Sequence, residues 1–542
     1  MPLAPSTPTP RLRPAEPSEA ARASLLRQAR RATATAVAGA VPTGTAAARR
    51  VAPHPLPTIS VATQLRQVIA DAWRAVTARR DTYATAGGWG YISPPADARA
   101  PDAIHIAHFT PATATAILAD VADWYDAVGH DAYPPERLAK IMCDKPESVP
   151  RLDGILHAPY LRRDGAIILS PGYDPTSRKY LSLPPGWAIP SLPTRPTPAD
   201  VKAAVRLLGD ELLCDFPFAR ESDKAHAFSE LLTPVVRDYI DGATPLHLNE
   251  APQQGTGKGL LAEVAVRVAT GTMPESAQYV TDEAEMQKTL VATLLQGPSV
   301  VLLDNLAGTI ESAALATALT EPIYRGRLLG ESRMLRLPIS GVTWIATGNN
   351  CTLGSDYPRR TIHVRLDART DQPHLRTGFR HALPKWAVEH RAELIHALLI
   401  LVRAWQTAGC PAGQRTRGRY ESWAATIGGI LQIADIPGFL DPGADPMDDE
   451  TSEWRALTDA WWAEYAGNNI TPAKLVQVAL RAGLLTSLLA SAKGELGQAS
   501  KMGKALQQRR DRVFGDYTIL AQDARNRRGQ QEYYLRLRGV SP

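Results

Sequence analysis

The stretch LHLNEAPQQGTGKGLLAEVA, which begins at Leu246, has nearly the residue spacing of a phosphate-binding loop. The pattern G-x-x-x-x-G-K-[ST] requires glycine where Pro252 stands and a hydroxyl where Gly259 stands. An apolar run precedes the glycines and an amphipathic run follows them, which predicts a strand, a loop and a helix. That order favours a phosphate site over a glycine turn that happens to precede a surface lysine.

The glycines of this loop let successive backbone N–H groups turn toward phosphate oxygens. The helix that begins near Lys258 adds its positive end, and the Lys258 ammonium reaches the β- and γ-phosphates. The residues predicted to bind nucleotide are Gln254, Gly255, Thr256, Gly257, Lys258, Gly259 and Leu260.

Three further segments follow the loop in order. GPSVVLLDNLAG is a buried apolar strand with Asp304 at its end, a carboxylate suited to holding Mg²⁺ through water. GVTWIATGNN is a second buried strand that ends at Asn349, and Arg359 and Arg360 follow just before another strand. Any α/β sheet has strands that end in Asp or Asn, but the complete series favours a nucleotide-hydrolysing site over chance.

The elements that must position these residues come after a long N-terminal region. Residues 1–57 are Pro, Ala, Thr and Arg with almost no aromatics, which predicts a disordered basic tail. Residues 58–195 mix short strands such as GWGYIS and KYLSL with helices such as TATAILADVADWYDAV. They predict a small α+β domain whose role the sequence leaves open.

Thr197 and Pro198 are expected to begin a helical segment at 196–240. Apolar strands then alternate with helices over 241–384, the pattern of an α/β core. Residues 385–445 are predicted to be helical, and the acidic stretch DPGADPMDDETSE is predicted to link them to a separate unit at 451–542.

A family resemblance emerges from five of these stretches: APQQGTGKGLLAEV, VVLLDN, WIATGNN, RRTIHVRLD and YESWAATIGGILQIADIPGFL. They resemble the AAA+ family, particularly the superfamily 3 helicases of viruses, phages and integrated elements, and look like the helicase portion of phage primase-helicase proteins. The resemblance covers roughly residues 200–440. The expected fold is therefore α/β: an AAA+ P-loop ATPase core with an N-terminal α+β domain, a helical collar at 196–240, a helical lid and a C-terminal winged helix.

The resemblance also implies roles for matching residues. ATP and Mg²⁺ are the expected cofactors, with Lys258 binding phosphate and Asp304 organising the metal. Asn349 would be the sensor that positions the attacking water. Arg360, with Arg359 as the alternative, would be the finger that reaches the ATP of a neighbouring subunit in a ring, which we expect to be a homohexamer.

Three positions depart from the family pattern. Pro252 replaces only a turn glycine, and proline fits such a loop. Gly259 removes the hydroxyl that normally ligates Mg²⁺, so the metal must take water or depend more on Asp304. Asn305 stands where many AAA+ proteins carry a catalytic glutamate, and an amide cannot act as a base. Hydrolysis is thus expected to be slow or to use another carboxylate.

The segment EPIYRGRLLGESRMLRLPIS predicts a β-hairpin around GES. In the helicase family a hairpin before the sensor strand carries a basic residue into the central channel, where it grips single-stranded nucleic acid. Arg333 is the expected residue here, with Arg327 and Arg336 in support. A surface hairpin with solvated arginines is the alternative interpretation.

The last segment predicts a winged helix-turn-helix. Thr471 and Pro472 should begin the helix TPAKLVQVALRAGLL, and SKMGKALQQRRDRVFG should form a second, basic helix. The strand, basic turn and strand that follow would be the wing. The residues expected to contact duplex DNA are Lys504, Arg509, Arg512, Arg525, Arg527 and Arg528. The alternative is a winged helix used only for protein contacts.

Charge is unevenly distributed in a chain whose net charge is +5. Residues 1–50 hold eight basic and two acidic residues, and residues 501–542 hold ten and four, so the remainder is net acidic. Basic ends suggest contact with a polyanion, although a solvated tail explains the N-terminal excess equally well.

Cellular location is inferred from what the sequence contains. No apolar run reaches the roughly 18 residues needed to span a bilayer, so no membrane association is expected. The Arg-rich N-terminal segment lacks the apolar core of a secretory signal, and we interpret it as a disordered tail rather than a transit peptide. The cysteines are far apart, which argues against a zinc site and favours a cytoplasmic location: Cys143, Cys214, Cys351 and Cys410.

These features predict an ATP-dependent, ring-forming DNA helicase or replication initiator of phage or mobile-element type, without a recognisable primase domain. Two other classes remain open at this point. One is an AAA+ loader or protein remodeller. The other is a nucleotide-gated DNA-binding protein with little turnover, which Gly259 and Asn305 would explain.

Overall fold

The computed structural model describes most of the chain beyond the N-terminal segment. The described residues are 56–93, 104–184, 186–273, 276–328, 330, 333–349, 351–354, 356–370, 372–441, 449–490, 492, 494–526 and 529–538. The predicted tail at 1–57 therefore lies almost entirely outside the described residues, as do residues 442–448 of the predicted acidic linker.

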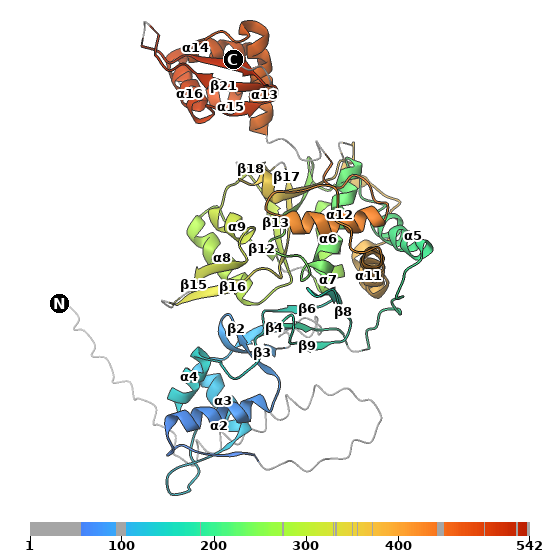
Figure 1. Cartoon of the computed structure of the whole chain (residues 1–542), viewed down its shortest axis with the longest axis vertical. Helices are drawn as coiled ribbons and strands as arrows, with labels where there is room; N and C mark the ends of the chain where they lie inside the picture. Colours follow the sequence, from blue (N-terminus) through green and yellow to red (C-terminus); the bar gives the residue numbers. More distant parts are fainter. Residues whose placement is uncertain are drawn as a thin grey trace, which may run out of the picture. The chain divides into compact units, whose positions relative to one another are not determined.

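The centre of the protein is a mixed α/β unit built on a five-stranded parallel sheet (Figure 1). The strand order is β12-β13-β17-β11-β19. Their bounds are β11 Leu246–Ala251, β12 Ser276–Ala277, β13 Val300–Leu306, β17 Thr343–Asn349 and β19 Thr361–Arg365. The inner strands β11 and β17 are buried over almost their whole length because helices cover both faces of a parallel sheet of this kind.

One face of the sheet shares a hydrophobic core with helices that precede β11, follow β11 and follow β19 in the chain. These are α5 Pro198–Arg206, a π-helical turn at Leu207–Leu212, α6 Glu221–Val236, α7 Lys258–Thr270, α10 Leu383–Glu389, α11 Arg391–Thr407 and α12 Glu421–Ile433. The segments predicted as collar and lid thus pack in one core. Thr197 caps α5 as predicted: its hydroxyl accepts from the Asp200 N–H, and the Asp200 carboxylate accepts from the Thr197 N–H.

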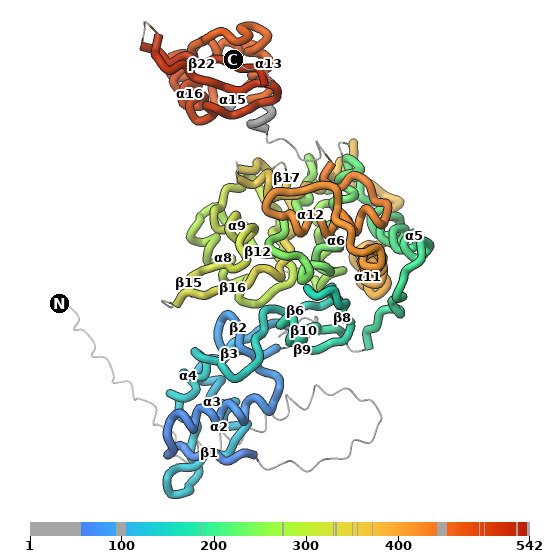
Figure 2. Tube along the Cα trace, in the orientation of Figure 1, coloured from blue at the N-terminus to red at the C-terminus, as the bar shows by residue number. Residues whose placement is uncertain are grey.

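The other face packs on α8 Glu283–Leu295 and α9 Ala313–Ala318 (Figure 1). Between β13 and β17 the chain makes an excursion that Figure 2 follows, including an antiparallel hairpin of β15 Ile323–Arg327 and β16 Met334–Pro338. This confirms the predicted hairpin. Shorter elements complete the unit: β14 Thr309–Ile310, β18 Thr352–Leu353, and 3-10 turns at Pro358–Arg360 and Pro373–Leu375.

The N-terminal part is an α+β arrangement of small sheets, as its mixed pattern predicts. Its elements are β1 Thr58–Ser60, α2 Leu65–Thr77, β2 Thr82–Thr85, β3 Gly88–Ser93, β4 His105–His108, α3 Pro111–Val121, β5 Asp123–Tyr125, α4 Glu136–Asp144, β6 Gly154–Leu156, β7 Tyr160–Leu161, β8 Ile167–Ile168, β9 Gly172–Asp174 and β10 Lys179–Leu181.

One predicted helix in this part was too long. TATAILADVADWYDAV was expected to be helical throughout, but α3 ends at Val121 and the next residues form β5. The reason is tertiary: β5 pairs in parallel with β1, and the indole of Trp124 is buried and donates to the Leu118 carbonyl at 2.8 Å. Pairing with a distant strand overrides local helix preference.

The C-terminal part has helices α13 Asp449–Tyr465, α14 Pro472–Ala482, α15 Thr486–Ala490 and α16 Gly494–Gln508, and a three-stranded antiparallel sheet of β20 Val513–Phe514, β21 Tyr517–Ala521 and β22 Tyr533–Leu537. Thr471 precedes α14 as predicted but makes no side-chain capping bond.

A second boundary also differs. The predicted basic helix runs past Arg509 and Arg512, whereas α16 ends at Gln508. Asp511 adopts a left-handed backbone conformation, φ 65°, that a continuing helix excludes. Arg509 and Arg512 therefore lie in the turn before β20. No helix among the described residues is long and apolar enough to cross a membrane.

Candidate nucleotide-binding site

Three neighbouring strands bring the predicted site residues to one edge of the sheet. Ala251, the last residue of β11, pairs in register with Asn349, the last residue of β17. On the far side of β17, β13 is parallel and carries Asp304 near its end. Ligands of open parallel sheets bind outside the carboxyl ends of the strands, and the glycine-rich loop leaves β11 at this edge.

The loop itself has the backbone that its glycines require. Gly255 and Gly257 have φ values of 80° and 109°, in the left-handed region that favours glycine. A Cβ on Gly255 would also come within 3.0 Å of the His374 Cβ. Gly257 caps α7 without a side chain, so the first-turn N–H groups are left to bind an anion. The hydroxyl of Thr256 is not aimed at a ligand, because it donates to the Gln253 carbonyl at 2.9 Å.

The Asp304 side chain is exposed to solvent, and a hydrogen bond from a buried residue of the neighbouring strand fixes its position. The hydroxyl of Thr347, a residue only 1% exposed on β17, donates to Asp304 Oδ1 at 2.5 Å and accepts from the Asn305 N–H at 2.8 Å. The pairing of β13 with β17 shifts register between Leu303 and Leu306, a bulge in which Asn305 has a φ of 55°. Asn tolerates this conformation better than most residues, which gives a physical reason for an amide at this position.

The carboxylate of Asp304 fits Mg²⁺, which keeps several waters and needs only one or two carboxylates besides substrate phosphates. One oxygen of Asp304 is bonded to Thr347, and the exposed side chain offers the other. Among the described residues, no group of three or more His, Cys, Asp or Glu side chains could hold a metal by itself.

Replacing Thr347 by valine is expected to weaken Mg²⁺-dependent nucleotide binding by on the order of tenfold, because a group that orients a metal ligand typically contributes 10- to 100-fold. The measurement is a Mg²⁺ titration of the binding of a fluorescent ATP analogue. Thr347→Ser should behave as wild type because it keeps the hydroxyl. Thr343→Val is a matched control on the same strand, since the buried Thr343 hydroxyl has no partner among the described residues. Equal Mg²⁺ dependence in all three variants would contradict the assigned role.

Asn349 offers an unoccupied polar atom beside the loop. Its Oδ1 is buried and has no hydrogen-bond partner among the described residues. A buried amide oxygen without a partner costs stability, so its presence at this edge calls for a bound water or ligand. This arrangement fits a residue that positions water near a phosphate.

Gly259, the second residue of α7, has open space around it. Apart from its chain neighbours and the backbone of its own helix, a Cβ built there would have none of the described atoms within 4 Å. The missing hydroxyl is therefore not excluded by packing, and the helix backbone there is compatible with other residues.

Gly259→Thr is accordingly expected to keep the fold and to tighten Mg²⁺ binding with nucleotide by up to roughly tenfold, about 1.4 kcal/mol, because it adds a hydroxyl ligand. Gly259→Ala is the matched control: it adds the same Cβ and removes the same glycine flexibility. Mg²⁺ titrations of nucleotide binding compare the two. Identical curves for the threonine and alanine variants would show that the hydroxyl does not reach the metal.

Glu250 is a carboxylate at this edge that the sequence motifs did not single out. It is 7% exposed, and its oxygens accept from the Cys351 N–H and from His363 Nδ1, both at 3.2 Å. Burial raises its pKa, but the hydrogen bond and charge of His363 and the charge of Arg365 outweigh it and lower the pKa overall. A carboxylate at the end of the strand that precedes the loop was the available signal.

Cys351 joins Glu250 to β13: its N–H donates to Glu250 and its thiol donates to the Leu306 carbonyl at 3.1 Å. Burial, followed by the charge of Glu250, raises the pKa of its thiol to about 11, while the charge of Lys258 acts in the opposite direction. Glu250 thus holds the backbone after the predicted sensor, close to the loop.

The two candidate finger arginines differ in exposure. They lie on the 3-10 turn at Pro358–Arg360. Asp356 binds both: Arg359 Nη2 lies 2.7 Å from its Oδ1, and Arg360 Nη1 donates to its carbonyl at 2.5 Å. The Arg359 side chain is 66% exposed, while that of Arg360 is 11% exposed and has a buried Nε without a described partner. Asp356 therefore restrains both side chains within the subunit.

The hairpin presents an exposed basic side that includes a residue missed in the sequence. Arg325 pairs directly with Arg336 across the two strands, and Arg327 pairs with Met334; all four are exposed. Like charges directly opposite each other destabilise a hairpin, so their juxtaposition favours an anionic partner. Arg325 precedes Arg327 by two residues, and this spacing places both on one side of a strand.

Arg333 is engaged differently. Its Nη2 donates to the Gly87 carbonyl, in the turn between β2 and β3, at 2.8 Å. Burial and then the charge of Arg333 lower the pKa of His108 on β4. The residue expected to grip nucleic acid is thus bound to the N-terminal part here, and its channel role stays a prediction.

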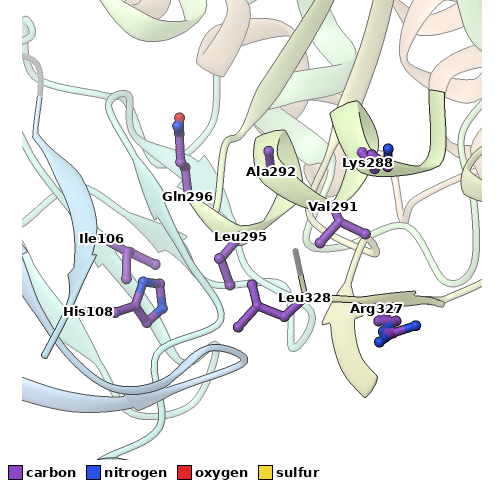
Figure 3. Close-up of a pocket in the computed structure, with 9 residues that line it drawn as sticks. All are labelled: Ile106, His108, Lys288, Val291, Ala292, Leu295, Gln296, Arg327 and Leu328. Atoms are coloured by element: carbon purple, nitrogen blue, oxygen red, sulfur yellow. The ribbon is translucent and has the colours of Figure 1, made fainter. Parts of the chain in front are cut away.

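A cavity of about 260 Å³ lies beside this contact (Figure 3). Ile106 and His108 of β4, Val291 and Leu295 of α8, and Leu328 after β15 line it. Its walls are mainly apolar and include no residue of the glycine-rich loop, so it is distinct from the nucleotide site.

Two of the predicted basic residues of the C-terminal part contact aromatic rings. Arg509 lies over the Trp454 ring at 4.6 Å, and Arg512 over the Phe514 ring at 5.4 Å. Lys504 on α16 and Arg525 in the turn between β21 and β22 are exposed. Arg527 and Arg528 lie outside the described residues. Of the six predicted contacts, Lys504, Arg512 and Arg525 are exposed, and Arg509 is partly buried.

Comparisons with known proteins find similarity only among solved structures; no family model and no curated protein matches. The apo C-terminal region of NrS-1 is 11% identical, with 85% of this chain and 98% of that one covered and a TM-score of 0.38. The JCV helicase is 16% identical, with 44% and 60% covered and a TM-score of 0.21. The SCCmec type IV Cch, described as an active helicase, is 14% identical, with 74% and 82% covered and a TM-score of 0.27. Similarity this low leaves the functional assignment to the geometry of the site.

Proposed function

We propose that this chain is an ATP-dependent DNA helicase or replication initiator of AAA+ type that acts as a ring, which the family resemblance implies is a hexamer. The observation that carries the proposal is the meeting of the glycine-rich loop, Asp304 and Asn349 at the ends of three adjacent parallel strands. The motif order of the superfamily 3 helicases supports it.

Each residue at this edge has a distinct task. Lys258 and the first-turn N–H groups of α7 bind and orient the β- and γ-phosphates. Asp304, held by Thr347, binds Mg²⁺, which when present neutralises charge developing on the phosphates. Asn349 orients the attacking water. The amide of Asn305 cannot act as a base, and Glu250 is the carboxylate on the strand before the loop. Its bonds to His363 and Cys351 suit Glu250 to holding the site in place rather than to proton transfer.

Nucleic acid would be bound by two basic surfaces. The exposed hairpin side that carries Arg325, Arg327 and Arg336 would contact single-stranded DNA in the ring channel. Arg333 would join them once its bond to Gly87 is broken. The C-terminal part, as a winged helix, would contact duplex DNA.

Strand separation tests the proposal directly. The purified chain with ATP and Mg²⁺ should unwind a forked duplex, and unwinding should require hydrolysable nucleotide. An active ATPase that never separates strands would instead support the loader or remodeller. Tight nucleotide-dependent DNA binding with negligible turnover would support the gated binding protein, for which Gly259 and Asn305 provide the specific reason.

The turn between β21 and β22 gives a separate expectation. Replacing Arg525, Arg527 and Arg528 with alanine should weaken duplex binding similarly for all sequences, because the contacts are to phosphates. Each lost contact should lower the log–log salt slope by about 0.9 on duplex DNA and about 0.7 on single strands. DNA affinity measured at several salt concentrations provides the test, with DNA-independent ATP hydrolysis as the control that should barely change. An unaltered affinity and slope would favour a protein-binding role for this part.

A further inference from the structure

Arg417 contacts the turn that carries the two candidate finger arginines. It lies in the segment between α11 and α12. Its Nη2 donates to the carbonyls of Pro358 at 2.6 Å and Thr361 at 2.7 Å, and its Nε donates to the carbonyl of Arg359 at 3.1 Å. One guanidinium therefore binds three carbonyls within four consecutive residues.

The chemistry of these contacts is specific to arginine. A single 3-10 turn leaves carbonyls at its end without donors of its own, and side chains, water or ligands satisfy such groups. The guanidinium is planar and presents five N–H donors in a fixed fork, so it can bind several diverging acceptors at once. A lysine ammonium presents its donors from a single nitrogen and cannot reproduce this geometry.

Two buried tyrosine hydroxyls bind the turn and the segment that carries Arg417 to the ends of α9. The Tyr357 hydroxyl, directly before the turn, donates to the Ser312 carbonyl at 2.6 Å. Tyr420, three residues after Arg417, donates through its hydroxyl to the Leu319 carbonyl at 3.1 Å. Both tyrosines are 1% exposed. The turn and the segment that binds it are thus both secured to the chain around α9, and Arg417 connects them.

We propose that Arg417 is the positioning residue that fixes the direction of Arg359 and Arg360 for contact with a neighbouring subunit. It binds the backbone of the pair and not the nucleotide, so it acts on hydrolysis only through them. This inference rests on the proposed function, since it assumes a site shared between subunits.

The experiment is a complementation test with mixed subunits. Arg417→Ala is combined in rings with Lys258→Ala, which has an inactive loop, and separately with Arg360→Ala, which has an inactive finger. If Arg417 acts through the finger, its variant should recover turnover with Lys258→Ala and not with Arg360→Ala. Alone it should lose most turnover, by on the order of 100-fold or more, while retaining nucleotide affinity. Should Arg417→Ala fail to fold, Arg417→Lys takes its place and should show the same pattern.

Arg415→Ala is the matched control, because Arg415 lies in the same segment and approaches only Asp441, at 3.5 Å, among the described carboxylates. It should hydrolyse ATP as wild type does. Wild-type turnover in Arg417→Ala, or recovery with Arg360→Ala, would overturn the inference. Absence of turnover in mixtures of Lys258→Ala with Arg360→Ala would instead overturn the shared site itself, so the two failures are distinguishable.

Discussion

Lys258→Ala is expected to abolish ATP-dependent activity while the fold remains intact. The side chain begins α7 at the edge where β11, β13 and β17 end, and it supplies the charge-assisted contact to phosphate. Loss of such a contact in a site that stabilises developing charge typically costs about 10²–10³-fold in turnover. Nucleotide affinity should fall as well, because the contact also forms in the ground state.

The measurement is steady-state ATP hydrolysis together with binding of a fluorescent analogue, with circular dichroism to check folding. Lys385→Ala is a suitable control, since that lysine on α10 is 80% exposed and approaches only Glu389 among the described carboxylates, at 3.7 Å. A Lys258→Ala protein with wild-type turnover would mean that the glycine-rich loop is not the site of hydrolysis.

Arg360→Ala is expected to bind ATP normally and to hydrolyse it about 10³-fold or more slowly, as a finger acts on charge in the transition state. Arg359→Ala is measured beside it, because Arg359 is the more exposed of the two, at 66% against 11%. The variant with the larger loss of turnover at unchanged affinity identifies the finger.

Mixing provides the control for a shared site. In random equimolar rings of Arg360→Ala and Lys258→Ala subunits, roughly a quarter of the interfaces pair an intact loop with an intact finger. Those interfaces should restore some turnover. If rings shown to be mixed stay inactive, the arginine does not act across subunits.

Local features of the site could be predicted from the sequence. An apolar run before a glycine cluster, and an amphipathic run after it, specify β11, the loop and α7 because strand and helix periodicities are local properties. Gly255 and Gly257 have the left-handed backbone that their residue type allows. Thr197 and Asp200 form their capping bonds because the partners are three residues apart.

Contacts between distant residues were decided by the tertiary structure. Thr347 reaches Asp304, Glu250 reaches His363, and Arg417 reaches the carbonyls of the 358–361 turn only because strand order and register bring them together. The same reason explains why the end of α3 was predicted wrongly: the residues after Val121 pair as β5 with β1 instead of continuing the helix.

Residue patterns predicted the strands, the loop and the helix of the site and the residue types at their ends, whereas the ends of α3 and α16 were predicted wrongly. Only the tertiary structure places β17 between β11 and β13 and brings Arg333 to the Gly87 carbonyl. Residue spacing encodes hydrogen bonds and periodicity over a few residues. The order of parallel strands depends on which buried faces pack together across the whole core, and no local pattern specifies that choice.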